Sequence, residues 1–266
     1  MTIKPPFHYT GNKYKTIPMI ISNTPDGCGR YIDLFGGSGV VACNLASHGY
    51  ENVCYNERDT KVFDLFNFAS HASRSAEFKE RLCQINNSYP DTKEAYLNLR
   101  QSYNECNSNF HLYLLVCRSF SNGIRFNSKG EFNLPYGERN HFDINRIEAC
   151  SGLNISTFNS DFRDFKFYDD DWVFIDPPYT GTTATYNKGW SIKDDQDLFE
   201  MMDRFSERGI KFCYTNVLSN RGFNNDMLQD YLNNRKYNVL STNGDFRNTS
   251  FRKSDEPTQE IMVMNY

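Results

Sequence analysis

Four consecutive residues, Asp176-Pro177-Pro178-Tyr179, bring a carboxylate, a backbone carbonyl and an aromatic ring together. The apolar residues 172–175 before them predict a short buried strand, and the prolines predict a rigid turn because proline fixes φ and cannot donate to a ladder. Asp176 and the Pro177 carbonyl can accept hydrogen bonds from the exocyclic amine of a nucleic-acid base, and Tyr179 can stack on that base. This arrangement suits methylation of an amino group and needs neither a metal nor a covalent nucleophile. An ordinary turn after a strand is the alternative.

A glycine-rich turn, Gly-Gly-Ser-Gly at 36–39, separates a predicted strand (30–35) from a predicted helix (40–46). Glycines at such a junction let a ligand approach the backbone closely. Glu57 ends the next predicted strand about 20 residues later, where α/β nucleotide sites bind ribose hydroxyls. Asp33, just before the turn, could face a cationic amino group. A solvated Glu57 is the alternative interpretation.

The composition indicates a packed protein. The chain has 266 residues, with 22 Phe and 17 Tyr, which allows one large or two small domains with a substantial core. Its eight cysteines include no CxxC pair and no signal peptide precedes them, so we expect reduced thiols in a cytoplasmic protein. The five histidines form no metal-ligand pattern, and no apolar run is long enough to span a bilayer. Because the net charge is −4, any nucleic-acid-binding face must be local.

The N-terminal segment Tyr-Thr-Gly-Asn-Lys at 9–13 precedes a predicted helix with Ile17, Ile20 and Ile21 on one face. A Gly-Asn turn that opens a helix offers backbone N–H groups to an anionic group, and Lys13 could add charge. A plain turn before a core-packing helix is the stronger alternative.

Residues 60–117 change to a helical pattern and predict an inserted helical subdomain. The segment that follows, 118–139, predicts a β-hairpin around Asn-Ser-Lys-Gly, with arginines and phenylalanines interleaved. Arginine on a β-ribbon can bind guanine bidentately, and an exposed aromatic can wedge into the gap left by an extruded base. A solvated charged hairpin is the competing interpretation.

The C-terminal half supplies further candidate walls for a site. Asp161 and Phe162 precede the strand at 172–175 and could line a cofactor pocket, while residues 185–190 predict a loop over it. A polar segment, 242–257, carries Arg247, Arg252 and Lys253 before a last strand at 260–264.

Taken together, these pieces resemble the Dam family of DNA adenine methyltransferases, in particular its short phage-encoded members. The resemblance covers nearly the whole chain. Its motifs are YTGNK at 9–13, DLFGGSG at 33–39, Asn-Glu at 56–57, FSNGIRFNSKGEFNLPYG at 120–137, DPPY at 176–179 and YNKGW at 186–190.

The resemblance implies an α/β fold. A Rossmann-like S-adenosylmethionine-dependent methyltransferase core would cover 1–59 and 156–266, and an inserted helical and β-hairpin target-recognition subdomain would cover 60–155. It also implies S-adenosyl-L-methionine as cofactor and methyl transfer to the N6 amine of a flipped adenine in double-stranded DNA. The target would be GATC or a relaxed GATC-like site.

The family's site residues can be carried over by motif match. The flipped base would be held by Asp176, Pro177, Pro178 and Tyr179. The cofactor would be bound by Tyr9, Lys13, Asp33, Phe35, Gly37, Glu57, Asp161, Phe162 and Asp176. DNA would be contacted by Arg118, Phe120, Ser121, Asn122, Arg125, Asn127, Pro135 and Arg139.

Within the DNA set, Phe120 matches the intercalating aromatic, Arg125 the guanine reader and Pro135 an apolar contact. Gly123 departs from the family, where a larger apolar side chain usually touches a base, and this departure predicts a relaxed recognition sequence. Glu57 replaces the commoner aspartate and should keep the hydroxyl hydrogen bonds.

Three other functions fit parts of the sequence. A cytosine-N4 DNA methyltransferase could use the same turn, as could an enzyme that methylates protein glutamine, although such enzymes usually have Asn in place of Asp176. A catalytically silent DNA-binding protein is the third. We expect no metal and no membrane. The protein would act as a monomer or weak dimer in a bacterial or phage-infected cell, with a possible restriction endonuclease counterpart.

Overall fold

The computed structural model describes residues 2–70, 75–179, 189–220, 223–242 and 258–266. The loop predicted over the site at 185–188 and the basic side chains of Arg247, Arg252 and Lys253 lie outside the described residues.

The described strands form a single sheet, in the order β3-β2-β1-β4-β5-β8-β7, with β6 paired to β5. Strands β1 to β5 run parallel, whereas β8 is antiparallel to both β5 and β7. The bounds are β1 (Tyr31–Asp33), β2 (Val53–Asn56), β3 (Ile155–Phe158), β4 (Trp172–Ile175), β5 (Lys211–Asn220), β6 (Phe223–Asn224), β7 (Asn238–Thr242) and β8 (Gln259–Met264). The strands predicted before the glycine turn, before Glu57 and before Asp176 are therefore confirmed, and their parallel pairing brings their carboxyl ends to one edge.

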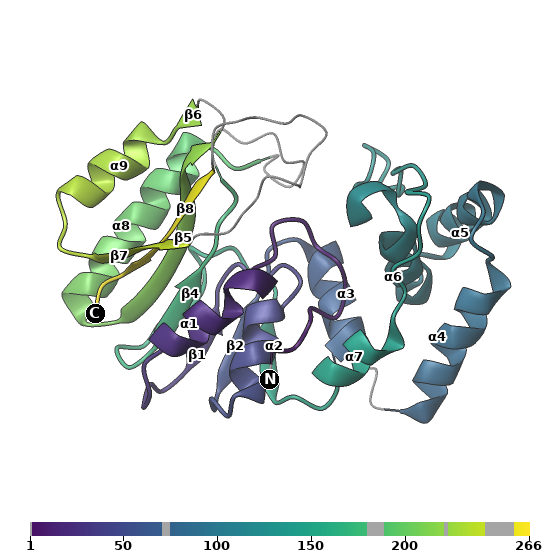
Figure 1. The fold of residues 1–266 in the computed structure, drawn as a ribbon, viewed down its shortest axis with the longest axis horizontal. Coiled ribbons are helices and arrows are strands. Elements are labelled where there is room, and N and C mark those ends of the chain that lie inside the picture. The colour runs from purple at the N-terminus through teal and green to yellow at the C-terminus, as the bar shows by residue number, and fades with distance from the viewer. Residues whose placement is uncertain (1, 71–74, 180–188, 221–222, 243–257) are drawn as a thin grey trace.

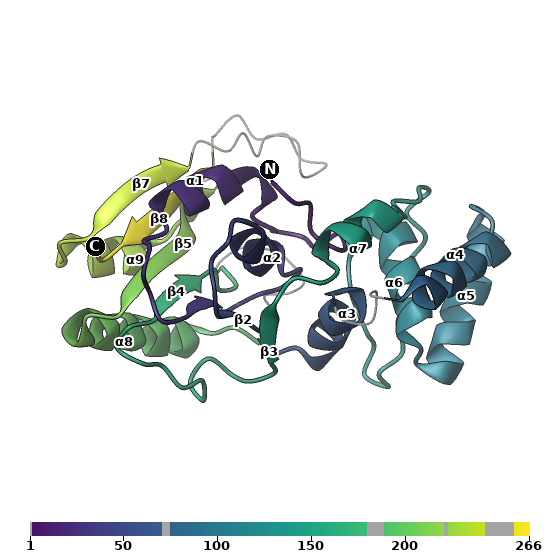
Figure 2. The same cartoon turned by 90° about the horizontal axis from the view of Figure 1, so that it is seen from below.

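Helices cover both faces of this sheet (Figures 1 and 2). They are η1 (Tyr14–Thr16), α1 (Ile17–Asn23), α2 (Val40–Ser47), α3 (Thr60–Ser70), α4 (Ala76–Ser88), α5 (Lys93–Cys106), α6 (Asn109–Arg118), η3 (Phe120–Asn122), α7 (Ile144–Cys150), α8 (Ile192–Arg208) and α9 (Asp226–Asn233). No described helix combines the length and the apolar character that a bilayer crossing requires.

The strands alternate their side chains between two apolar layers, as the period of two requires. Tyr31, Trp172 and Phe174 pack into the layer with α1, α2 and α3, whereas Ile32 and Val173 pack into the layer with α8 and α9. The first layer continues without a break into α4–α7, which lie at the far end of the molecule from β7 and β8 (Figure 1). The helices of the inserted segment therefore share a core with the sheet.

The segment predicted as a β-hairpin reverses the chain but forms almost no ladder. Its described bridges are the isolated pairs Ser119–Tyr136 and Phe126–Phe132. The second limb bonds both to the first limb, where the Asn133 amide donates to the Arg125 carbonyl at 3.1 Å, and to α5. In α5, Asn104 Oδ1 accepts the Phe132 amide at 2.8 Å, and Tyr96 donates to the Leu134 carbonyl at 2.9 Å. Helix α5 thus pairs with the outward-facing backbone groups of the second limb, whereas the alternate residues bond to the first limb.

The glycine turn is tightly packed beneath the site. Gly39 has φ of +71°, and a Cβ there would lie 2.0 Å from the Phe66 ring. That ring in turn stacks on Tyr55 with centroids 3.8 Å apart. Position 39 therefore requires glycine for two reasons: the backbone is left-handed, and the Phe66 ring leaves no room for a Cβ.

Gly49 offers a matched control, because its φ is +89° but nothing lies within 4 Å of its Cβ position. We expect Gly49→Ala to cost about 1 kcal/mol of unfolding free energy through the backbone alone. Gly39→Ala should cost about 1–3 kcal/mol more because the methyl group overpacks the turn. Urea titration of both variants measures the difference, and equal losses would contradict this account of the turn.

Candidate active site

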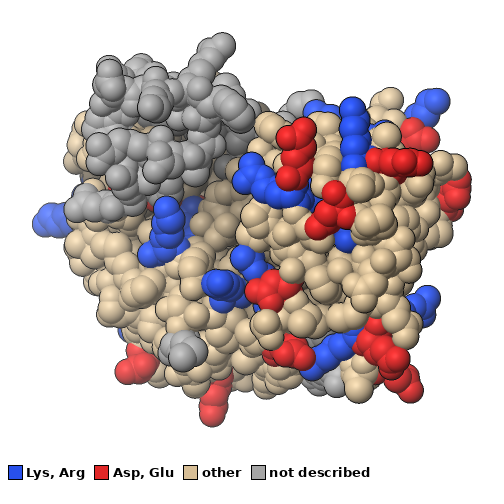
Figure 3. Space-filling model, turned by 45° about the vertical axis from the view of Figure 1, so that its right-hand side comes forward, with Lys and Arg blue, Asp and Glu red and all other residues tan. Residues whose placement is uncertain are grey.

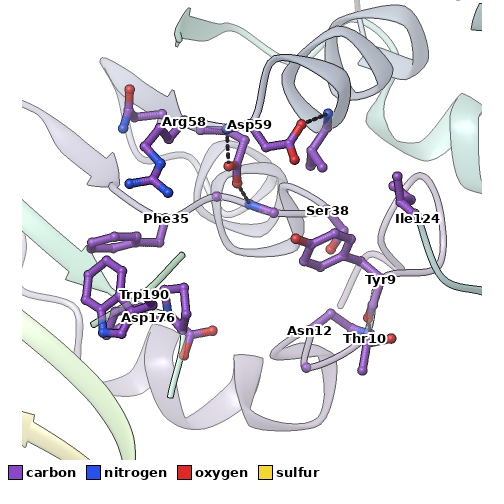
Figure 4. A pocket seen from close by; sticks show the side chains of 18 of the residues that line it. Tyr9, Thr10, Asn12, Phe35, Ser38, Arg58, Asp59, Ile124, Asp176 and Trp190 are labelled. Atoms are coloured by element: carbon purple, nitrogen blue, oxygen red, sulfur yellow. Dashed lines mark hydrogen bonds between the residues drawn. The ribbon is translucent and has the colours of Figure 1, made fainter. Parts of the chain in front are cut away.

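A cavity of about 880 Å³ lies at the carboxyl ends of β1, β2 and β4. Its wall combines the N-terminal segment, the glycine turn, the loop after β2, the 122–128 part of the hairpin segment and the Asp-Pro-Pro-Tyr turn. In Figure 4, Phe35 and Trp190 lie on one side of Asp176, and Tyr9 and Ile124 on the other. The topology thus brings together five segments that are separate in the sequence.

The glycine turn and Glu57 form one unit of this wall. Glu57 Oε2 accepts the Gly37 amide at 3.0 Å, and Oε1 accepts the Asp59 amide at 2.8 Å, as the dashed lines of Figure 4 show. Tyr55 donates to the Gly37 carbonyl at 2.8 Å. The predicted residues Gly37 and Glu57 therefore meet, with a carboxylate beside the backbone of the turn.

Two carboxyl groups in this region, Asp33 and Glu57, have raised pKa values. Burial raises the pKa of Glu57 to about 7, against the lowering effect of the Asp59 and Gly37 amides. Burial likewise raises the pKa of Asp33 to about 7, and the nearby carboxylate of Asp176 adds to the shift. Asp33 Oδ2 accepts the Ala42 amide at 3.1 Å.

Three aromatic rings form a second unit. The ring centroids of Phe35 and Phe162 lie 5.5 Å apart, and Trp190 completes the group at 5.6 and 5.7 Å from them. The Trp190 indole donates to Asp195 Oδ1 at 2.9 Å, which fixes its orientation. The sequence places Trp190 near the site only through the YNKGW motif, and its packing on Phe35 was not predicted.

Asp161 was predicted as a cofactor residue, but it does not line the described cavity. Its carboxylate pairs with Arg58 at 3.2 Å and with Arg163 at 3.0 Å. Arg58 does line the cavity, so Asp161 contacts the site through that arginine.

The carboxylate of Asp176 is held by three donors. Tyr179 and Thr215 hydroxyls donate to Oδ1, each at 2.9 Å, and the Lys13 ammonium lies 2.7 Å from Oδ2. Lys13 also donates to the Tyr179 oxygen at 2.8 Å. Lys13 therefore lines the cavity as predicted, but its charge is directed at Asp176.

Sequence reasoning missed Thr215 and Glu260 as members of this cluster. Glu260 is 3% exposed; its Oε1 lies 3.4 Å from Lys13 Nζ and accepts the Tyr179 hydroxyl at 3.2 Å. The available signals were weak: Thr215 ends a predicted strand, and Glu260 is a charged residue beside an apolar run.

The hairpin segment brings its predicted reader to the cavity. Arg125 lines it, and Asn133 holds the guanidinium: Nε donates to Asn133 Oδ1 at 2.7 Å and Nη2 to the Asn133 carbonyl at 2.9 Å. Phe120 is 46% exposed, as an intercalating side chain requires.

The remaining predicted DNA residues divide by position. Ser121, Pro135 and Arg139 are exposed, whereas Asn122 lines the cavity and donates to the Val116 carbonyl at 2.9 Å. Asn127 shapes the turn, since its Oδ1 accepts the Lys129 and Glu131 amides. On the face shown in Figure 3, basic side chains lie among acidic ones and form no continuous basic surface.

The prediction that Arg118 contacts DNA needs correction. Its side chain is 2% exposed and donates to the Tyr89 carbonyl at 2.7 Å and to the Asn86 carbonyl at 3.1 Å. Those carbonyls end α4, where a cation is favoured by the helix dipole. Arg118 is therefore a buried structural residue in this arrangement.

Comparison with known proteins agrees with this geometry. The family model for the D12 class N6 adenine-specific DNA methyltransferase matches residues 9–245. The chain is 28% identical over 281 residues to modification methylase StsI of Streptococcus sanguinis, and 30% identical over 281 residues to type II methyltransferase M.FokI of Planomicrobium okeanokoites. Each alignment covers 99% of this chain and 43% of the relative, so the chain spans less than half of their length.

A shorter relative is matched more evenly. The DNA adenine methylase of Salmonella typhimurium is 26% identical over 225 residues, which cover 78% of each chain. The predicted resemblance to adenine methylases is thereby confirmed, and neither the cytosine nor the glutamine alternative is supported. The Rossmann-like α/β core agrees with the observed sheet.

Members of this family use S-adenosylmethionine as methyl donor. The matched region contains the glycine turn, Glu57, the hairpin segment and the Asp176 turn, and these are the parts that meet at the cavity. The chain belongs to the D12 class of N6 adenine-specific DNA methyltransferases.

Proposed function

We propose that this chain transfers a methyl group from S-adenosylmethionine to the N6 amine of adenine in duplex DNA. The observation that carries the proposal is the state of Asp176. A carboxylate has about four acceptor positions. Described residues fill three of them, which leaves one on Oδ2. The orientation of that oxygen is fixed before a base arrives, as electrostatic preorganisation requires.

The cavity has the groups that S-adenosylmethionine needs. Glu57 lies beside the backbone of Gly37, where it can accept from ribose hydroxyls, and Phe35 and Phe162 offer faces for the cofactor's adenine. Asp33 supplies a carboxyl group for a cationic amine, and Tyr9 packs over Gly37. When bound there, the cofactor supplies a methyl group already activated by its sulfonium.

The protein's part is then to hold the amine. Asp176 Oδ2 and the Pro177 carbonyl accept its two hydrogens, Pro178 keeps the turn rigid, and Tyr179 packs against the base. Because the amine is not reachable within the stack, the adenine must be extruded at a cost of a few kcal/mol. Much of the acceleration comes from holding two substrates in one orientation.

Sequence recognition is assigned to residues 60–155, and the chemistry to 1–59 and 156–266. Asn133 occupies one edge of the Arg125 guanidinium, so the outer edge remains to bind guanine O6 and N7. Phe120 would fill the gap left by the extruded base. GATC or a relaxed GATC-like site is the proposed target.

Gly123 supports the relaxed form of that site. Its φ is −80°, so the backbone does not require glycine, and a Cβ would meet only the flexible tip of Leu134 at 2.9 Å. A larger residue would therefore fit here if the Leu134 side chain shifted, and this chain has no base-contacting side chain at the position. Because relatives are named modification methylases, a restriction endonuclease counterpart is part of the proposal, with action as a monomer or weak dimer in the cytoplasm.

The direct test is methyl transfer from labelled S-adenosylmethionine to duplexes that differ only in GATC or GTTC, followed by identification of the methylated nucleoside. N6-methyladenine on the first duplex alone is expected. Asp176→Ala should lower transfer by at least about 100-fold. The variant should keep cofactor binding, since Lys13 retains Glu260 as a partner. Absence of product from the unchanged protein on both duplexes would overturn the proposal and favour a silent fold.

Arg125→Ala tests the guanine reader. The two substrates are the GATC duplex and a duplex in which that guanine is replaced by another base. We expect Arg125→Ala to lower the discrimination between them, measured as the ratio of their kcat/KM values, by about 1–3 kcal/mol. Arg139→Ala is the matched control. Arg139 is exposed, and its loss should weaken binding to both duplexes equally. An unchanged ratio in Arg125→Ala would remove it as the reader.

The raised pKa of Glu57 predicts a pH dependence for ribose binding. Hydroxyl donors favour the ionised carboxylate, so the affinity for adenosine should rise as pH increases from about 6 to about 8 through the pKa of about 7. Adenosine suits this titration because it carries no group that ionises in that range. Calorimetry should show a smaller rise in Glu57→Gln, and an identical rise in both proteins would exclude Glu57.

A further inference from the structure

Glu260 is a buried carboxylate behind Asp176 that does not line the described cavity. It lies on β8, and its Oε2 accepts the Thr242 hydroxyl of β7 at 3.1 Å. Its other oxygen, Oε1, faces the Lys13 ammonium at 3.4 Å and the Tyr179 hydroxyl at 3.2 Å. Both partners of Oε1 also contact Asp176, so Glu260 reaches the site through them.

The cluster contains two carboxylates and one ammonium. Lys13 and Glu260 are 6% and 4% exposed in their side chains, and Asp176 is 17% exposed. Charges that are this poorly hydrated interact more strongly than in water. These three groups alone carry a net charge of −1, and the buried Asp33 lies close enough for both Asp176 and Lys13 to shift its pKa.

Asp176 has to accept a hydrogen bond from a neutral amine, and an ammonium 2.7 Å from Oδ2 weakens that oxygen as an acceptor. A second carboxylate on the far side of the ammonium offsets this effect. We propose that Glu260 is a positioning residue that balances the charge of Lys13, so that Asp176 remains a strong acceptor for the target amine. This inference rests on the proposed adenine methyl transfer.

Stability alone cannot test this role, because buried ion pairs often contribute little net free energy to folding. Glu260→Gln keeps the side-chain shape and the hydrogen bond with Thr242 but removes the charge. We expect its single-turnover transfer rate, with cofactor and GATC duplex saturating, to fall by about 10- to 100-fold. The affinity for cofactor should not change.

Asp171→Asn is the matched control. Asp171 is also buried and paired, with Arg30 at 2.6 Å, but it precedes β4 at the end of the strand away from Asp176. This variant should lose thermal stability and keep the transfer rate. A similar slowing in both variants would mean that the loss of any buried charge is enough, and the inference would be wrong.

A double-mutant cycle with Lys13→Met separates charge balance from a purely structural role. Without the ammonium, Asp176 and Glu260 repel each other, so adding Glu260→Gln should raise the rate above that of Lys13→Met alone. The same substitution lowers the rate when Lys13 is present. If the two changes slow transfer independently, Glu260 does not act through Lys13.

The outcomes distinguish this inference from the function on which it rests. If the unchanged protein transfers no methyl group to adenine, the proposed function fails and the inference with it. If it transfers and Glu260→Gln is equally fast, only the inference fails. Should Glu260→Gln not fold, Glu260→Asp keeps a carboxylate on β8 but withdraws it from Lys13 by one methylene group; slower transfer with unchanged cofactor affinity is expected, and an unchanged rate would reject the role.

Discussion

The contact between the Lys13 ammonium and the Asp176 carboxylate is the interaction on which the site depends. It ties the N-terminal segment to the end of β4 across the cavity floor. A charge pair with so little water must be satisfied on every side, and this need accounts for the hydroxyls of Tyr179 and Thr215. The Asp176 carboxylate is consequently held by groups from three parts of the chain.

The parallel order of the sheet makes this convergence possible. Because β1, β2 and β4 end at the same edge and the longer β5 passes Asp176 at Thr215, the glycine turn, Glu57, Asp176 and Thr215 become neighbours without long loops. The antiparallel strands β7 and β8 then add Thr242 and Glu260 from behind. Acidic groups thus gather at this edge of the sheet, whereas Arg125 reaches the cavity from the hairpin segment.

Local sequence patterns predicted those strands and turns of the site whose backbone conformation is determined by residues adjacent in the sequence. The strand before Asp176, the glycine turn and the acidic end of β2 each have a pattern of apolar residues, glycine or proline that determines the backbone locally. Arg118 shows the limit: its residue type suggested a DNA contact, yet it binds carbonyls of Asn86 and Tyr89 at the end of α4. Glu260 could not be assigned either, because its partner Lys13 lies near the other end of the chain. The contacts of the hairpin segment with α5 were also out of reach, since Asn104 and Tyr96 lie 28 and 38 residues before their partners in the chain.

The hairpin segment is attached to α5 and not to the sheet, so the residues proposed to recognise DNA and the residues around Asp176 are held by different parts of the fold. Its second limb is anchored through Phe132 and Leu134, and no described strand of the sheet pairs with residues 120–137. The side chains that we propose to contact DNA therefore lie outside the sheet that positions Asp176 and Glu57. In such an arrangement, substitutions of a few side chains in the hairpin segment can change the recognised DNA sequence among relatives. The sheet and the turns around Asp176 need not change with them.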